Sequence, residues 1–417
     1  MINRFQKIYH EFPRLFWIIV LARFIDALGG TILFPFFALY ITEKFGVGMA
    51  QAGVLLGMSS FFGLFGSMVG GALADKYGRR RLIVFGLVLS ALSSLLFGLA
   101  NNINLLYPLV ILVGLLSSLA YPAHDAMLAD ILPENKRQEG FGILRVAFNF
   151  AWIFGTAFGG LIATRSFFAL FATDCILSCI VAVMIYRSLP ETKPTSRIEM
   201  QEEKSLWTTI MGYRLVLRDL IFIFYLLAGI LAIIVYQQQY STLSVYLRDV
   251  HNIDSKGYGL ILSITGLEVV LFQFWISRTI RRHPPFFIMM LGTIFFAIGV
   301  FMYGLFSTFT MFMVAAVVVC IGEMLFFPTS QALSVSFAPE DMRGRYMALS
   351  GLTWSIPATI GPAAAGYLLD NTNPNSLWYI GGLICVIAAI GYYLLHLRLR
   401  SQPQFAPLKE EPEPAIS

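Results

Sequence analysis

Long apolar segments, separated by shorter polar ones, recur along almost the whole chain. Each is about as long as, or longer than, the roughly 20 residues that an α-helix rising ~1.5 Å per residue needs to cross ~30 Å of hydrocarbon. The pattern therefore predicts an all-α membrane protein with twelve membrane-spanning helices. Their expected ranges are 15–42, 51–74, 82–100, 103–128, 140–163, 167–188, 218–247, 257–277, 286–306, 310–335, 346–369 and 376–398.

The order of the predicted spans divides the chain into two halves. The segment "LPETKPTSRIEMQEEKSLW" between the sixth and seventh spans is polar and charged, which is typical of a linker. Moving one half along the other by 206 residues aligns Pro122 with Pro328 and Gly160 with Gly366 without a gap. Two bundles repeated in the same orientation are typical of transporters that hold substrate at the repeat interface. The expected domains are a six-helix bundle at 1–188, a cytoplasmic linker at 189–217, a second six-helix bundle at 218–398 and a disordered cytoplasmic tail at 399–417.

Composition and charge agree with this membrane assignment. The chain is 57% hydrophobic and only 13% charged, about half the share of charged residues in soluble domains. Most Lys and Arg residues fall on the side of the membrane that holds both termini, so the positive-inside rule places both termini in the cytoplasm of a cell (inner) membrane protein. The net charge of +5 follows from this topology and gives no reason to expect a nucleic-acid partner. A removable signal peptide is not expected, because the first span is long and contains Arg23, Asp26 and Pro35.

The sequence contains no signature of enzymatic chemistry. The four cysteines, Cys175, Cys179, Cys320 and Cys385, lie inside predicted spans and show neither a disulfide framework nor metal-ligand spacing. We find no phosphate-binding loop, nucleophile elbow or cofactor fingerprint. We therefore expect no enzyme activity, no metal and no cofactor.

The loop between the second and third spans carries a motif. "GGALADKYGRRR", residues 70–81, follows the pattern G-x-x-x-D-[RK]-x-G-R-[RK]. Its matching residues are Gly71, Asp75, Lys76, Gly78, Arg79 and Arg80. Gly71, four residues before Asp75, permits close approach of two helices, and Gly78 permits a tight turn. The pattern resembles the signature loop of the major facilitator superfamily, which implies two pseudo-symmetric six-helix bundles and a loop that acts as a gate latch through Asp75.

A glycine-rich stretch in the fifth span is a second family-like element. "NFAWIFGTAFGG" is similar to the antiporter motif of the twelve-helix drug:proton antiporter branch, although Thr156 stands where that branch has proline. Its repeat in the second half, "TIGPAAAG", keeps the proline. The residues concerned are Gly155, Gly159, Gly160, Gly361, Pro362 and Gly366. Small residues let helices pack closely, so a sliding seam and plain structural packing both explain the pattern.

Several ionisable residues lie inside the predicted spans, where a charge costs at least ~2.5 to 3.5 kcal/mol at the membrane centre. The carboxylates are Asp26, Asp125, Asp174, Glu268 and Glu323, accompanied by Arg23 and Arg145. We expect Asp26, Glu268 and Glu323 to lie near midplane around one central chamber. Asp125 and Arg145 are expected to be partners, either with a structural role or as part of the inner gate, and Asp174 is expected to have a structural role.

Glu323 is the main candidate for proton exchange or for binding a substrate cation; the alternative is a glutamate that only fixes helix packing. Asp26 is a weaker candidate because Arg23, three residues earlier on the same helix face, can hold it ionised. Aromatic and amide side chains are expected to line the cavity beside these acids. They are Tyr40, Trp152, Tyr236, Gln237, Tyr240 and Trp354. Aromatic walls with one carboxylate suit lipophilic cations.

These observations predict a secondary active transporter that works by alternating access. By resemblance, its activity is proton-coupled efflux of hydrophobic or cationic drugs, and its partners are such small molecules, protons and the lipid bilayer, with a monomer as the expected state. A carrier of another solute, such as a sugar, siderophore, lysolipid or other metabolite, is one alternative. A membrane receptor or scaffold that transports nothing is the other.

Overall fold

The computed structural model describes residues 9, 11–192, 213–339, 342–402 and 405. The side chains of Gly71, Ala72, Asp75, Tyr121 and Asn135 lie outside this description. In the described residues, eleven segments are helical, long enough and apolar enough to cross a membrane. The remaining predicted span, 346–369, lies within the 29-residue helix α16 (Arg343–Asn371), whose Gly, Ser, Thr and Pro residues lower its mean hydropathy.

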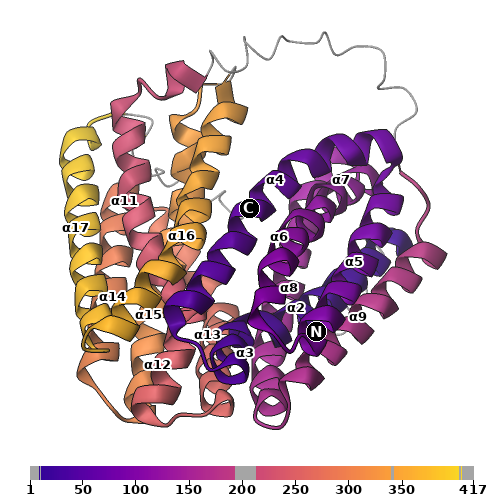
Figure 1. Cartoon of the computed structure of the whole chain (residues 1–417). Helices are drawn as coiled ribbons and strands as arrows, with labels where there is room; N and C mark the ends of the chain where they lie inside the picture. Colours follow the sequence, from indigo (N-terminus) through magenta and orange to yellow (C-terminus); the bar gives the residue numbers. More distant parts are fainter. Residues whose placement is uncertain (1–8, 10, 193–212, 340–341, 403–404, 406–417) are drawn as a thin grey trace. The chain divides into compact units, whose positions relative to one another are not determined.

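The helices of the first half follow the first six predicted spans (Figure 1). They are α2 (Arg14–Leu33), η1 (Phe34–Phe36), α3 (Phe37–Phe45), α4 (Met49–Tyr77), α5 (Arg79–Leu99), η2 (Ile103–Leu105), α6 (Leu106–Ser117), η3 (Ser118–Ala120), α7 (Tyr121–Ile131), α8 (Glu134–Ala163) and α9 (Phe167–Ser188). Two spans predicted as single helices are broken by short 3₁₀ segments. Pro35 lies in η1 and Pro122 in the first turn of α7, where a residue without an N–H group disrupts the α-helical hydrogen bonds.

Local chemistry explains where several of these helices begin. Pro13 and Pro133 directly precede α2 and α8 in extended conformations. The Ser166 side chain accepts a hydrogen bond from the Ala169 N–H group at the start of α9. Gly78, with φ of +100°, lets the chain turn directly from α4 into α5, in a conformation that glycine adopts far more readily than other residues.

The second half follows the same plan. Its helices are α11 (Leu220–Tyr236), η4 (Gln237–Tyr240), α12 (Thr242–His251), α13 (Ser255–Ile280), α14 (Pro285–Leu305), α15 (Phe309–Phe337), α16 and α17 (Ser376–Leu399). The Asp219 carboxylate accepts a hydrogen bond of 3.0 Å from the Phe222 N–H group and so caps α11. The predicted span 218–247 is interrupted at η4, between α11 and α12.

The chain forms two compact units that do not follow the two halves exclusively. The first unit contains Met1–Met200, Tyr240–Leu267 and Pro362–Asp370, and the second contains Gln201–Gln239, Glu268–Gly361 and Asn371–Ser417. The first residues of α13 and the last residues of α16 therefore group with the first bundle. The domain limits that we expect at residues 188 and 218 stay a prediction.

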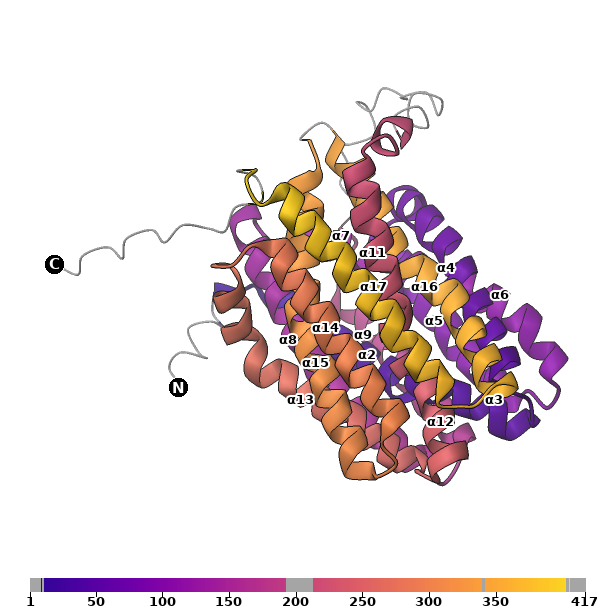
Figure 2. The same cartoon turned by 90° about the vertical axis from the view of Figure 1, so that its left-hand side faces the viewer.

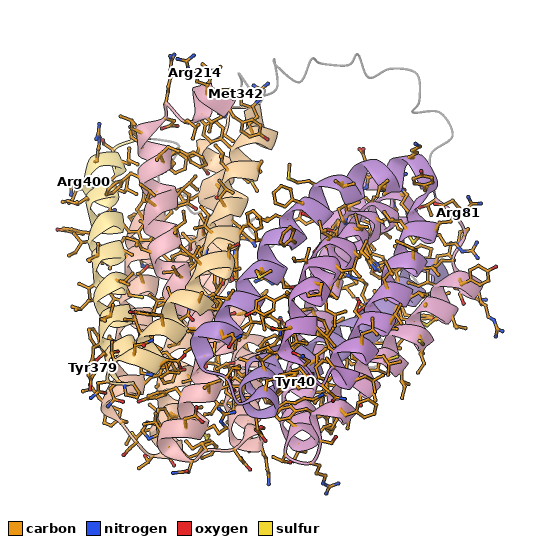
Figure 3. The ribbon with its side chains drawn as sticks, viewed as in Figure 1. Tyr40, Arg81, Arg214, Met342, Tyr379 and Arg400 are labelled. Atoms are coloured by element: carbon orange, nitrogen blue, oxygen red, sulfur yellow. The ribbon has the colours of Figure 1, made fainter. Side chains whose placement is uncertain are left out.

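Each unit has its own packing pattern. In the first, α5 lies beside α9, and α2 packs against both α8 and α9 (Figure 1). In the second, α14 packs along both α15 and α17, and Figure 2 shows α14 and α17 side by side. Figure 3 shows Arg214, Met342 and Arg400 toward one end of the second unit and Tyr379 toward the other. The two labelled arginines thus lie at the same end of that unit, and the predicted topology stays a prediction.

Within the first unit, Asp370 near the end of α16 contacts the first turn of α4. The Asp370 carboxylate accepts hydrogen bonds from the N–H groups of Met49, at 3.0 Å, and Ala50, at 2.8 Å. A Cβ atom added to Gly48 would collide with this carboxylate, so the close approach depends on glycine there. A carboxylate at a helix N-terminus satisfies N–H groups that have no partner within the helix and interacts favourably with the helix dipole.

Replacing Asp370 with alanine is expected to release the first turn of α4. Loss of a helix-capping carboxylate costs about 1 kcal/mol. The amide protons of Met49 and Ala50 should then exchange with deuterium about fivefold faster, as measured by mass spectrometry on peptides covering this turn. Asp249→Asn is the matched control, because Asp249 is an exposed partner of its neighbour Arg248. Equal exchange rates in Asp370→Ala and the unaltered protein would contradict the capping role.

Candidate functional site

Two glutamates lie close together in the second unit. Glu268 on α13 is 9% exposed, and the thiol of the fully buried Cys320 on α15 is hydrogen-bonded to it. Glu323, three residues after Cys320, interacts electrostatically with Glu268. Because residues three apart share one face of a helix, Cys320 and Glu323 both face the side of α15 that Glu268 approaches. The sequence placed both glutamates near one chamber, but it did not identify Cys320 as the residue beside them.

The surroundings of Glu268 leave its charge uncompensated. Its Oε2 atom is buried and has no hydrogen-bond partner in the described residues. Two carboxylates in one apolar site favour a state in which at least one of them carries a proton, since like charges repel and burial disfavours ionisation. This arrangement can therefore bind and release a proton, or accept a cation when both groups are ionised.

Aromatic rings surround the next turn of α15. Phe327, four residues after Glu323, stacks on Trp354 of α16 at 5.0 Å between ring centroids. Tyr236 of α11 meets Phe327 edge to face at 5.0 Å and lies 6.3 Å from Trp354. We call Tyr236, Phe327 and Trp354 the aromatic cluster. Trp354 is 45% exposed, so the cluster presents an open ring surface. Phe327 of the cluster shares a face of α15 with Glu323, four residues earlier.

Amide groups border the aromatic cluster. The Gln237 side chain donates a hydrogen bond of 3.2 Å to the carbonyl oxygen of Trp354. A Cβ atom on Gly361 would collide with the amide nitrogen of Gln238, so this glycine lets η4 and α16 approach closely. Tyr236, Gln237 and Trp354, three of the residues predicted from the sequence, thus lie together in one place.

Asp26 lies in a different polar region, within the first unit. It forms an ion pair of 3.9 Å with Arg23, the partner expected from their spacing. Both residues line a cavity of about 70 Å³ together with Gly86, Leu87, Ser90, Ser117, Ala120 and His124. This volume holds several water molecules. The expectation that Asp26, Glu268 and Glu323 surround one chamber stays a prediction.

Two other predicted placements are corrected by the structure. Arg145 and Asp125 are both exposed, and in the described residues neither takes part in an ion pair with the other. The cation within electrostatic reach of Asp125 is Arg23. The short loop between α7 and α8 therefore does not make Arg145 the partner of Asp125. Tyr40 does not line a cavity: it is 1% exposed and its hydroxyl group donates to the Phe97 carbonyl oxygen.

Trp152 and Tyr240 meet edge to face at 5.3 Å in the first unit, and both are partly exposed. They form an aromatic pair separate from the aromatic cluster of the second unit.

The signature loop is held by residues that the motif does not contain. Arg79 forms an ion pair of 2.9 Å with Asp130 at the end of α7. The Arg79 N–H group also donates a hydrogen bond of 2.7 Å to Glu191, which caps the start of α5. Arg80 donates to the Tyr186 carbonyl oxygen and lies over the Tyr186 ring. The Asp75 side chain lies outside the described residues, so its role as a latch stays a prediction.

The glycine-rich motif brings helices together within the first unit. Added Cβ atoms at Gly155 and Gly159 would collide with Thr31 and Ile32 of α2, and one at Gly160 would collide with Ser255 at the start of α13. In the repeat, Gly366 lies against Met49, and the Pro362 carbonyl lies against Gly53. The motif therefore has a packing function; a role as a sliding seam stays a prediction.

Comparison with known proteins settles the family. The sequence profile of the Major Facilitator Superfamily matches residues 19–258 and 239–417. The chain belongs to the major facilitator superfamily.

Relatives and solved structures agree with this membership. The chain is 30% identical to a Na⁺, Li⁺, K⁺/H⁺ antiporter of Planococcus maritimus, over 85% of this chain and 88% of the relative. It is 25% identical to multidrug resistance protein MdtH of Salmonella paratyphi B, over 89% and 92% of the two chains. These relatives are transporters and not enzymes, which confirms that part of the prediction. The protein is therefore a multi-pass membrane transporter of the superfamily.

Solved structures confirm the fold class. A POT family transporter in complex with 5-aminolevulinic acid has a TM-score of 0.77 at 16% identity, over 93% of this chain and 97% of that one. The nucleoside transporter NupG has a TM-score of 0.76 at 14% identity, over 92% and 99% of the two chains. At such low identity these neighbours establish the major facilitator fold of two six-helix bundles and nothing about the substrate.

Sequence reasoning missed two residues that hold this transporter's signature loop, Asp130 and Glu191. Glu191 comes three residues after the end of α9, within the range that the sequence predicts as linker because the segment is polar. The signal that was available is Leu189, an apolar residue at the linker's first position, which the structure buries to 3% exposure. A buried leucine holds this segment against the bundle and so places Glu191 at the start of α5.

Proposed function

We propose that this transporter is a proton-coupled antiporter that exports hydrophobic or cationic small molecules across the cell membrane, as a monomer with both termini in the cytoplasm. The observation that carries the proposal is the position of Glu323. It lies midway along α15, close to Glu268, and one helical turn from Phe327 of the aromatic cluster. A carboxylate beside aromatic faces suits a lipophilic cation through an ion pair, cation–π contacts and apolar burial.

The same group can couple the two transport steps. When Glu323 is ionised, it attracts a cation from the cytoplasmic side. When a proton from the outer side binds to Glu323, the ion pair is lost and the cation leaves. Return of the protonated site to the cytoplasmic side releases the proton, so the inward proton gradient drives outward substrate movement. In alternating access, the site opens to only one side of the membrane at a time, so neither the proton nor the cation can leak straight through.

A second candidate function is exchange of monovalent cations for protons. It is favoured by the 30% identity to the Na⁺, Li⁺, K⁺/H⁺ antiporter, which covers 85% of this chain. The Glu268 and Glu323 carboxylates are oxygen ligands of the kind that such ions prefer. Under this alternative, the aromatic cluster would contribute packing and would not contact the transported ion.

Transport by the purified protein in proteoliposomes tests the proposal. With a pH-sensitive dye inside, addition of a lipophilic cation should release protons from acid-loaded vesicles, and an imposed gradient should drive accumulation of that cation. Na⁺ and K⁺ are tested in parallel. Proton movement with Na⁺ or K⁺ alone would favour the second candidate. Uptake of a sugar or peptide without proton movement, or no transport of any solute, would refute both and leave the other carriers or a receptor role.

A further inference from the structure

A buried acid lies in the first bundle, apart from the glutamates of the second unit. Asp174 on α9 is 6% exposed. The Ser94 hydroxyl group on α5 donates a hydrogen bond to its Oδ2 atom. Gly29 on α2 lies so close that an added Cβ atom would stand 2.6 Å from its Oδ1 atom. Asp174 is thus enclosed where α2, α5 and α9 meet.

No basic side chain balances this carboxylate in the described residues. On α2, the titratable group within its electrostatic reach is another acid, Asp26. On α5 it meets the neutral hydroxyl of Ser94, and on α9 its neighbour Cys175. In the described part of α8, the remaining helix packed on α9, no charged group contacts it. A buried ionised carboxylate without a counter-ion is strongly disfavoured, so the environment favours the neutral acid.

Asp174 lies close to the cavity of the first unit. Ser90, which lines the cavity, is one helical turn from Ser94 on α5. Asp26, which also lines it, is one turn from Gly29 on α2. Both helices therefore lead from the cavity to Asp174 within about 6 Å along their axes. The cavity is lined by charged and hydroxyl side chains and has room for several water molecules, which could carry protons to the acid.

We propose that Asp174 and Ser94 form a second proton-binding site, in the first bundle, which exchanges its proton with Asp26 through the cavity. The proposal deepens the proposed function, because it rests on proton coupling as the driving force. A hydronium ion gives its proton to an Asp174 oxygen, an O–H bond forms and a water molecule is left. The reverse step gives the proton to the Asp26 carboxylate through water.

Asp174 and Asp26 lie at similar depths along the bundle. It lies two turns from the first residue of α9, about 10 Å, at the end of the bundle that we predict faces outward. Asp26 lies twelve residues into α2, about 18 Å from the end that we predict faces the cytoplasm. Because the hydrocarbon core is ~30 Å thick, Asp26 lies about 12 Å from the outer end, so the two acids lie at similar depths and a proton can pass between them across the bundle.

Infrared difference spectroscopy of the purified full-length protein tests the site without any transport assay. Acid-minus-alkaline spectra should contain a carboxylic acid band that Asp174→Asn removes. Ser94→Ala should shift this band, because the acid loses its hydroxyl partner. Ser93→Ala is the matched control, since the Ser93 hydroxyl bonds to the Leu89 carbonyl oxygen of its own helix. Its spectrum should equal that of the unaltered protein.

Proton counting gives a second measurement on the same samples. Between alkaline and acidic pH, Asp174→Asn should take up about one proton per molecule less than the unaltered protein. Unchanged bands in both Asp174→Asn and Ser94→Ala, with an unchanged proton count, would overturn the proposal. If Asp174→Asn does not fold, the band shift in Ser94→Ala decides. Absence of proton-driven transport in the unaltered protein would refute the proposed function alone, because neither measurement depends on transport.

Discussion

Glu323→Gln is expected to uncouple substrate movement from the proton gradient. The variant keeps the shape and hydrogen-bonding capacity of the side chain but can neither ionise nor exchange a proton. Coupling between two ligands of one protein is typically worth about 1 to 3 kcal/mol, so gradient-driven accumulation in proteoliposomes should fall by about 5- to 150-fold. Binding of a lipophilic cation should weaken with acidification in the unaltered protein, because protons compete for Glu323, and should be independent of pH in the variant.

Two comparisons make this result specific. Glu43→Gln changes an exposed acid of α3 that lies 3.8 Å from Arg248, and it should leave both accumulation and pH dependence unchanged. Glu268→Gln should reduce accumulation less than Glu323→Gln, because Glu268 is nearly buried and our proposal assigns the ion pair with the substrate to Glu323. Accumulation by Glu323→Gln equal to that of the unaltered protein would reject Glu323 as the coupling group.

The acids of the two bundles have different surroundings, and this difference suggests a division of work. Glu323 lies one helical turn from Phe327, which stacks on the exposed ring of Trp354, where a large apolar cation has a surface to bind. Asp174 is enclosed by Gly29 and Ser94, where only a proton or a water molecule has room. A proton site in the first bundle would let one proton bias the conformation while another competes with the substrate at Glu323.

The helices could be predicted from the sequence because hydrophobic length alone reports a membrane span. The tight turn at Gly78 was also predictable, since its motif requires a glycine between two spans, and the structure gives it a φ of +100°. The interruptions at Phe34–Phe36 and Gln237–Tyr240 were not, because a short 3₁₀ segment changes neither the length nor the apolar character of a span.

Side-chain partners were harder to predict than spans, because they depend on helix rotation. Tyr40 resembled a cavity residue in the sequence, yet its helix turns it toward Phe97 and Phe171, where ring packing and one hydrogen bond bury it. Asp125 was assigned to Arg145 by closeness in the chain, whereas the helices bring it within reach of Arg23. Periodicity gives the face of a helix but not the neighbour that this face meets.

The aromatic cluster gives the second prediction with a large effect, because it separates the two candidate functions. Phe327→Ala and Trp354→Ala each remove one ring surface beside Glu323. A cation–π contact contributes about 0.5 to 2 kcal/mol, so each variant should bind a lipophilic cation about 2- to 30-fold more weakly, and the double variant more weakly still. Fluorescence titration of a cationic dye measures this change.

Trp275→Ala is the matched control for ring removal. Trp275 is an exposed tryptophan on α13 that contacts Phe274 and lies outside the aromatic cluster, so its loss should leave dye affinity unchanged. Exchange of Na⁺ or K⁺ for protons, if present, should be equal in all these variants, because a small hydrated ion is held by carboxylate oxygens and gains little from rings. Unaltered dye affinity in the double variant would remove the aromatic cluster from the substrate site and, with it, the main argument for lipophilic cations over inorganic ones.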